Sequence, residues 1–114
     1  MADIYVVPKG PRNSFRAWRV VTSKGAKLGH EQLQALARKF FVDPVCETVA
    51  FARPGRGCIV WYKDGVYDAE GEMALYIVRK LGMGAGIERI KCGQGTFGSA
   101  KPYVNGLLEV AQWV

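Results

Sequence analysis

Residues Cys58 to Leu81 read CIVWYKDGVYDAEGEMALYIVRKL, and this stretch decides the fold because it joins a strand, a turn and a helix. Its first residues are β-branched or aromatic, which favours a strand, and the Asp-Gly pair at 64–65 is typical of a tight turn. Asp68 is a suitable N-cap for the helix that follows, and basic residues near its end match the helix dipole. Its apolar stripe consists of Ala74, Ile77, Val78 and Leu81.

The preceding part of the chain repeats this order. Ile4–Val7 and Phe15–Thr22 are β-prone runs separated by a turn-rich, basic segment, so we expect an antiparallel hairpin. Both faces of the second run carry an arginine and apolar groups, which leaves its buried face undetermined. A helix is predicted over residues 30–41, and Glu47–Arg53 is a further strand-like run. The apolar stripe of this first helix consists of Leu33, Leu36, Ala37, Phe40 and Phe41.

These elements predict a small α+β fold in a single domain over residues 1–114. We expect a mainly antiparallel sheet of four to six strands with two amphipathic helices on one face, in a ββα-ββα-ββ order. Trp18 and Trp61 occupy corresponding strands of the two ββα units, which indicates a weak internal repeat.

The segment Leu81–Gly98 holds six of the fourteen glycines and ends in a literal G-x-G-x-x-G at Gly93–Gly98. A dinucleotide-binding loop must open a helix, but Pro102 disfavours helical geometry just after the motif. We therefore interpret the segment as a hinge between the second helix and the last strands. A nest of backbone amides that binds an anion is the alternative.

Two interpretations compete for residues 103–114. Asn105-Gly106 is the preferred pair for a two-residue hairpin turn, which would join Tyr103-Val104 to Leu107-Leu108. The spacing of the later apolar residues also fits a helix capped by Asn105. We favour the hairpin.

The net charge of +6 lies wholly in the first half of the chain. Residues 1–57 hold ten Lys and Arg against four Asp and Glu, whereas residues 58–114 hold six of each. This imbalance favours a polyanionic partner. We find no secretory signal and no apolar run long enough to span a bilayer, so a cytoplasmic location without membrane contact is expected.

Basic residues of the first hairpin and of the loop before Cys58 are interleaved with aromatic residues. Positive charge along a backbone, with rings on which bases can stack, is what single-stranded nucleic acids require. The same residues would also suit an acidic protein surface. The predicted binding residues are Arg12, Phe15, Arg16, Trp18, Arg19, Lys24, Lys27, Arg53 and Arg56.

The sequence therefore favours a non-enzymatic binding module, and the first hypothesis is a nucleic-acid-binding module. The second is a protein-binding adaptor or inhibitor, of the compact kind that mobile elements encode, docking on an acidic surface. The third is a small nucleotide-binding or enzymatic domain that uses Gly93–Gly98. We expect no catalytic residue, cofactor or metal ion, since His30 is the only histidine and the three cysteines form no CxxC pair. The oligomeric state stays open.

Overall fold

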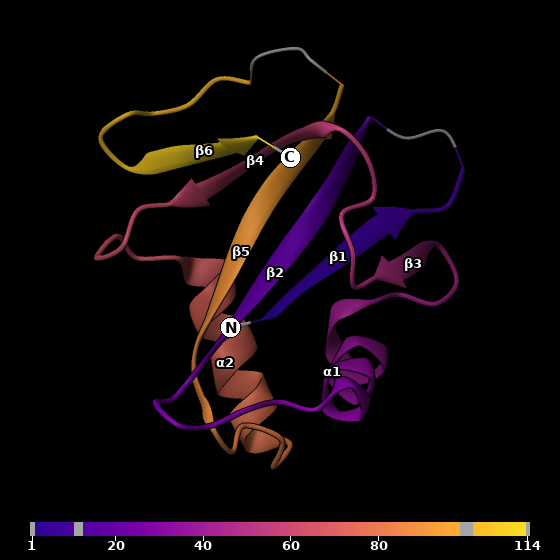
Figure 1. Cartoon of the computed structure of the whole chain (residues 1–114), viewed down its shortest axis with the longest axis vertical. Helices are drawn as coiled ribbons and strands as arrows, with labels where there is room; N and C mark the ends of the chain where they lie inside the picture. The colour runs from indigo at the N-terminus through magenta and orange to yellow at the C-terminus, as the bar shows by residue number, and fades with distance from the viewer. Residues whose placement is uncertain (1, 11–12, 99–101, 114) are drawn as a thin grey trace.

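A computed structural model describes residues 2–10, 13–98 and 102–113 and shows one six-stranded sheet with strand order β3-β1-β2-β5-β4-β6 (Figure 1). Every neighbouring pair of strands is antiparallel. The predicted α+β class and the ββα-ββα-ββ order are both confirmed. The strands are β1 (Ala2–Pro8), β2 (Ser14–Thr22), β3 (Glu47–Ala50), β4 (Gly57–Tyr62), β5 (Ile87–Phe97) and β6 (Glu109–Trp113).

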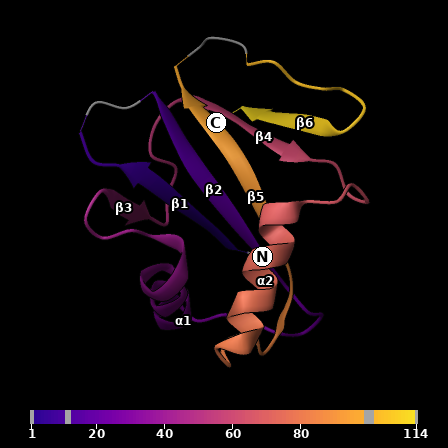
Figure 2. The same cartoon turned by 180° about the vertical axis from the view of Figure 1, so that it is seen from behind.

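Two helical segments cover one face of the sheet, as predicted (Figure 2). The first is α1 (His30–Leu36), which continues as the π-helical turn η1 (Ala37–Phe41), and the second is α2 (Ala69–Lys80). Their apolar side chains and those of the sheet form a cluster that we call the helix-side core. It contains Ile4, Val6, Trp18, Val20, Leu36, Ala37, Phe41, Ala74, Leu75, Val78, Ile87, Ile90 and Cys92.

The other face of the sheet has a second buried cluster, which we call the opposite core. It is built from strand residues alone and contains Tyr5, Val7, Phe15, Ala17, Ile59 and Trp61. The segment between β3 and β4 crosses over this face, and Gly55 lies against the ring of Phe97 (Figure 1). Because both faces of β2 are buried, the alternation along this strand could not identify a single buried face.

The two ββα units differ in three dimensions. β1 and β2 form the predicted hairpin, but β3 pairs with β1 whereas β4 pairs with β5. The strand β5 lies beside β2, so that β1, β2 and β5 lie between β3 and β4. The weak repeat in the sequence therefore does not extend to the pairing of the strands.

The prediction of a hinge at Leu81–Gly98 is wrong for its second half, because the G-x-G-x-x-G lies at the end of a strand. β5 runs through Gly93 and Gly95 to Phe97 and pairs with β2 on one side and β4 on the other. A Cβ at Gly93 would lie 2.7 Å from Cγ2 of Ile59, and one at Gly95 would overlap the Phe15 ring. These glycines let side chains of the opposite core lie directly on the strand.

The predicted hairpin of Tyr103-Val104 with Leu107-Leu108 is also wrong. The backbone oxygen of Asn105 accepts hydrogen bonds from the N–H groups of Leu108 and Glu109, and its side chain accepts one from Leu107. This single turn leads into β6, which pairs with β4 over five residues. The longer ladder along β4 offers more hydrogen bonds than a hairpin of two-residue arms.

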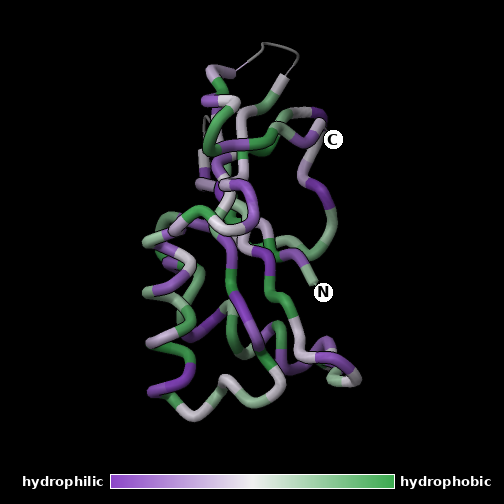
Figure 3. The backbone as a smooth tube through the Cα atoms, turned by 90° about the vertical axis from the view of Figure 1, so that its left-hand side faces the viewer, coloured by the Kyte–Doolittle hydropathy of each residue, from purple (hydrophilic) through white to green (hydrophobic). Residues whose placement is uncertain are grey.

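Hydrophobic and hydrophilic residues are interleaved along the chain rather than gathered in one block (Figure 3). Among the described residues, no helix is long and apolar enough to cross a membrane.

Candidate protein-binding groove

The aromatic members of the predicted binding set are buried in two different cores. Phe15 is 3% exposed in the opposite core, and Trp18 is 6% exposed in the helix-side core. In this conformation neither ring presents a free face on which a base could stack. Trp61, 2% exposed, is buried as well.

The basic members do not form one patch. Arg16 and Arg19 point to opposite faces of β2, because side chains alternate along a strand. Lys24 and Lys27 follow the far end of β2, where Ser23 N–H binds the Gly86 carbonyl. Arg53 and Arg56 lie toward the other end, where Gly98 N–H binds the Arg56 carbonyl, and Arg12 lies outside the described residues. Nine residues of strand at roughly 3.3 Å each separate these ends.

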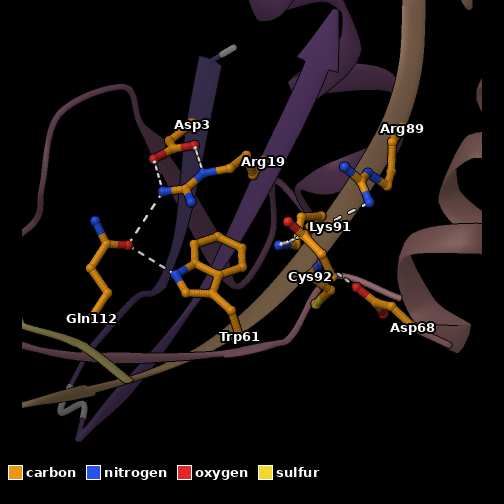
Figure 4. Close-up of polar contacts among 9 residues, drawn as sticks. Asp3, Arg19, Trp61, Asp68, Arg89, Lys91, Cys92 and Gln112 are labelled. Carbon is orange, nitrogen blue, oxygen red and sulfur yellow. Dashed lines mark hydrogen bonds and ion pairs between the residues drawn. The ribbon is translucent and has the colours of Figure 1, made fainter. Parts of the chain in front are cut away.

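Arg19 belongs to a polar network on the opposite core (Figure 4). Its guanidinium binds both carboxylate oxygens of Asp3 at 2.8 and 3.0 Å, and it lies 4.4 Å from the centre of the Trp61 ring. Gln112 Oε1 accepts hydrogen bonds from Trp61 Nε1 at 2.9 Å and from Arg19 at 3.3 Å. The hydrogen bond to Asp3 raises the pKa of Arg19, and the guanidinium, which is charged in any case, is taken up by contacts within the fold.

Arg16, by contrast, stands at the rim of an open apolar groove between η1 and α2. We call it the helix groove, and its volume is about 360 Å³. Both helical segments and the strand β2 contribute to it. It is lined by Arg16, Trp18, Phe40, Phe41, Ala69, Glu70, Met73 and Ala74.

Aromatic rings form the inner part of the helix groove. The Trp18 ring stacks on Phe41 with centroids 4.8 Å apart, and Phe40 meets Trp18 edge-on at 6.4 Å. Trp18 Nε1 is buried without a hydrogen-bond partner among the described residues. An unpaired buried donor costs free energy, so it is a rare feature that calls for a specific explanation.

The π-helical turn η1 places two consecutive phenylalanines at this groove. The N–H of Val42 binds the carbonyl of Ala37, five residues earlier, which widens the turn. The wider turn puts both Phe40 and Phe41 within ring contact of Trp18. Single π-turns of this kind occur mostly within α-helices and often at functional sites.

Two residues of opposite charge, Arg16 and Glu70, line the groove. Arg16 lies 6.0 Å from the centre of the Trp18 ring and forms no ion pair with the described residues. Glu70, in the first turn of α2, accepts a hydrogen bond from the Cys92 thiol at 3.0 Å. Burial, followed by this contact with Glu70, raises the pKa of Cys92 and keeps its thiol protonated and unreactive.

The exposed side of α2 extends the apolar surface of the groove. Met73 and Tyr76 are each 59% exposed, and the Lys80 ammonium lies 5.4 Å from the centre of the Tyr76 ring. The predicted stripe of α2 is correct at Ala74 and Val78 and wrong at Leu81, which is 52% exposed just after the helix ends, and the prediction missed this surface. The available signal was a methionine and a tyrosine at a spacing of three, beside the stripe rather than within it.

The described residues include no group of three or more His, Cys, Asp or Glu side chains placed to hold a metal ion. The segment Gly93–Phe97 is a central strand, so a nucleotide-binding loop lacks the geometry it requires there. Comparison with known proteins found no matching family model, no similar curated protein and no similar solved structure.

Proposed function

We propose that this protein is a small, non-enzymatic protein-binding module that takes an apolar side chain of its partner into the helix groove. The observation that carries this proposal is an open groove with aromatic walls, lined in part by Trp18, whose buried Nε1 has no hydrogen-bond partner among the described residues. Binding hot spots are typically large apolar side chains seated in such pockets and surrounded by polar rims.

The size and composition of the groove support a protein partner. Its volume of about 360 Å³ lies at the low end of the range for small-molecule sites, which is roughly 300–1,000 Å³. The exposed Met73 continues the apolar surface onto α2, and methionine adapts its shape to different partners. The surface therefore suits one or two side chains of a segment that lies along α2.

A phage-displayed library of random 12-residue peptides tests the proposal. Peptides enriched on the wild-type protein should bind at least tenfold more weakly to Met73→Asp, measured by isothermal titration calorimetry, because a carboxylate would be desolvated in the groove. The matched control is Tyr67→Asp, since Tyr67 is 75% exposed and does not line the groove. Equal binding to the wild type and Met73→Asp, or no enrichment at all, would overturn the proposal.

Nucleic-acid binding is the second candidate, favoured by the net charge of +6 and by the exposed arginines Arg53 and Arg56 near one end of the sheet. Such contacts would act through phosphate charge rather than base stacking, since Phe15 and Trp18 are buried. The same cations would also meet an acidic protein surface. A labelled single-stranded oligonucleotide titrated at 50 and 200 mM salt tests this candidate. Affinity that is absent at the lower salt, or that does not depend on salt, would exclude it.

A further inference from the structure

We infer that the partner segment carries an arginine or lysine close to its apolar anchor, and that this basic side chain enters a second pocket beside the helix groove. The inference rests on the proposed function, because the anchor in the helix groove brings the segment to this place. The second pocket, which we call the acidic pocket, has a volume of about 220 Å³. It is lined by Val60, Tyr62, Asp68, Ala69, Glu70, Cys92, Gln94 and Glu109.

The two pockets share lining residues at the beginning of α2. Ala69 and Glu70 line both of them, so one short segment can reach from the first pocket into the second. Arg16 lines the helix groove but not the acidic pocket. Its cross-strand neighbour Gln94 does line the acidic pocket, so Arg16 lies near that pocket, where three carboxylates outnumber its single positive charge.

The charge of the acidic pocket is opposite to that of the whole chain. Three carboxylates line it, and no lysine or arginine does, in a protein whose net charge is +6. Asp68 uses both oxygens within the fold, one for Gly71 N–H and one for Cys92 N–H. Its charge still contributes to the potential of the pocket.

The two glutamates have capacity left for a ligand. Glu70 accepts a hydrogen bond from the Cys92 thiol on one oxygen, and Glu109 accepts one from Asn105 N–H on one oxygen. The second oxygen of each has no hydrogen bond or ion pair with the described residues. Two such oxygens can receive the donors of a guanidinium or an ammonium group.

The remaining walls suit the stem of a long basic side chain. Val60 is partly buried, Ala69 presents a methyl group, and the Tyr62 side chain is 37% exposed. Lysine and arginine bury their methylene groups along such apolar surfaces while the charged end reaches polar groups. The ring of Tyr62 can also attract a nearby cation.

Three pools of fluorescein-labelled 12-residue peptides test the inference by fluorescence anisotropy. The first pool has a fixed leucine and one arginine placed at any position within four residues of it, among random uncharged residues. The second pool has glutamate in place of arginine, and the third has alanine in place of leucine. On the wild-type protein, the first pool should bind about five- to tenfold more tightly than the second.

The variants Glu70→Gln and Glu109→Gln remove charge while they keep a hydrogen-bond acceptor. In each variant, the affinities of the first and second pools should differ by no more than about twofold. The control Glu72→Gln should keep the wild-type difference, since Glu72 lines neither pocket. Urea denaturation of each variant shows whether its fold is retained. Since Glu70 and Glu109 lie on different elements, either folded variant suffices for the test.

The outcomes separate this inference from the proposed function. If the first and second pools bind equally and Met73→Asp abolishes the binding of both, the partner needs no basic residue, and the groove remains the binding site. Tighter binding of the second pool, or an arginine preference that persists in every glutamine variant that folds, would also overturn the inference. Binding of no pool, or equal binding of the first and third pools, would overturn the proposed function itself.

Discussion

The two faces of the sheet are closed in different ways. On one face, α1, η1 and α2 supply apolar side chains that cover the strands, and an open groove remains between the helices. On the other face no helix is present among the described residues, and rings from the strands lie on the bare backbone of Gly93 and Gly95. The Arg19 network joins β1, β2, β4 and β6 across that face.

The two faces therefore differ in the space that they leave: one contains a groove, and the other is closely packed. The helix-covered face contains the helix groove, which is lined by residues of η1, α2 and β2. The opposite core leaves no comparable room at its glycines, because the rings occupy the places of the missing side chains. Substitutions on the two faces should therefore differ in kind.

The largest effect is expected from Phe41→Ala in the helix-side core. Phe41 is 4% exposed and stacks on Trp18, so its loss leaves a cavity and should lower the free energy of unfolding by about 3–5 kcal/mol. Urea denaturation followed by tryptophan fluorescence measures the change. Leu81→Ala, at a residue 52% exposed, is the control and should change stability by less than about 0.5 kcal/mol. Equal midpoints for the two variants would contradict the assignment of this core.

Gly95→Val tests the opposite core by adding atoms rather than removing them. The new side chain would overlap the Phe15 ring, and the free energy of unfolding should fall by about 3 kcal/mol. Gly106→Val, where nothing lies within 4 Å of an added Cβ, should cost far less. If the two sites are coupled, the double variant Phe15→Ala/Gly95→Val should lose less stability than the sum of the two single losses. Strictly additive losses would show that the overlap with Phe15 is not the cause.

Gln112→Ala tests the Arg19 network on the opposite core. The change leaves Trp61 Nε1 without its acceptor, whereas Arg19 keeps Asp3 as a partner, so a loss of about 1–3 kcal/mol is expected. Gln112→Glu retains the acceptor and adds a charge beside Arg19, and it should stay close to the wild type. Thermal unfolding of both variants distinguishes them. A similar loss in both would show that the amide, not the acceptor, matters.

The smallest effect is expected from Asp64, which lies outside both cores. The hydrogen bond and the charge of Lys91, followed by the charge of Arg89, lower the pKa of Asp64 below its usual value. A lowered pKa stabilises the fold above the ordinary pKa of aspartate, about 3.9, and this contribution is lost as the pH falls through the lowered pKa. The stability of Asp64→Asn should therefore fall less steeply below pH 4 than that of the wild type. Identical pH profiles would refute this role.

Local patterns predicted the order of the elements well. The apolar stripes placed helices at residues 30–41 and after Asp68, and Asp68 accepts the predicted capping hydrogen bond from Gly71. Strand pairing was less accessible, because β5 inserts between β2 and β4 from a distant part of the sequence. Local sequence patterns do not indicate beside which strand a later strand will pair.

Of the nine predicted binding residues, Arg16 and Trp18 line the helix groove. Trp18 lines it as a buried ring rather than as a free stacking surface. The signal that misled the prediction was the mixture of arginines and aromatics on β2. Both faces of this strand are covered, so neighbouring residues were assigned to one surface although they belong to two.

By itself, the sequence determined the class of the fold, the positions of the helices and the Asp68 cap, because these depend on periodicity and on contacts within a few residues. Only the tertiary structure decided the role of the glycine-rich segment. Its glycines allow a loop or a strand equally, and the rings of Phe15 and Trp61 on neighbouring strands occupy the space above them. The helix groove is likewise a product of packing, since its lining residues come from β2, η1 and α2, which are distant in the sequence.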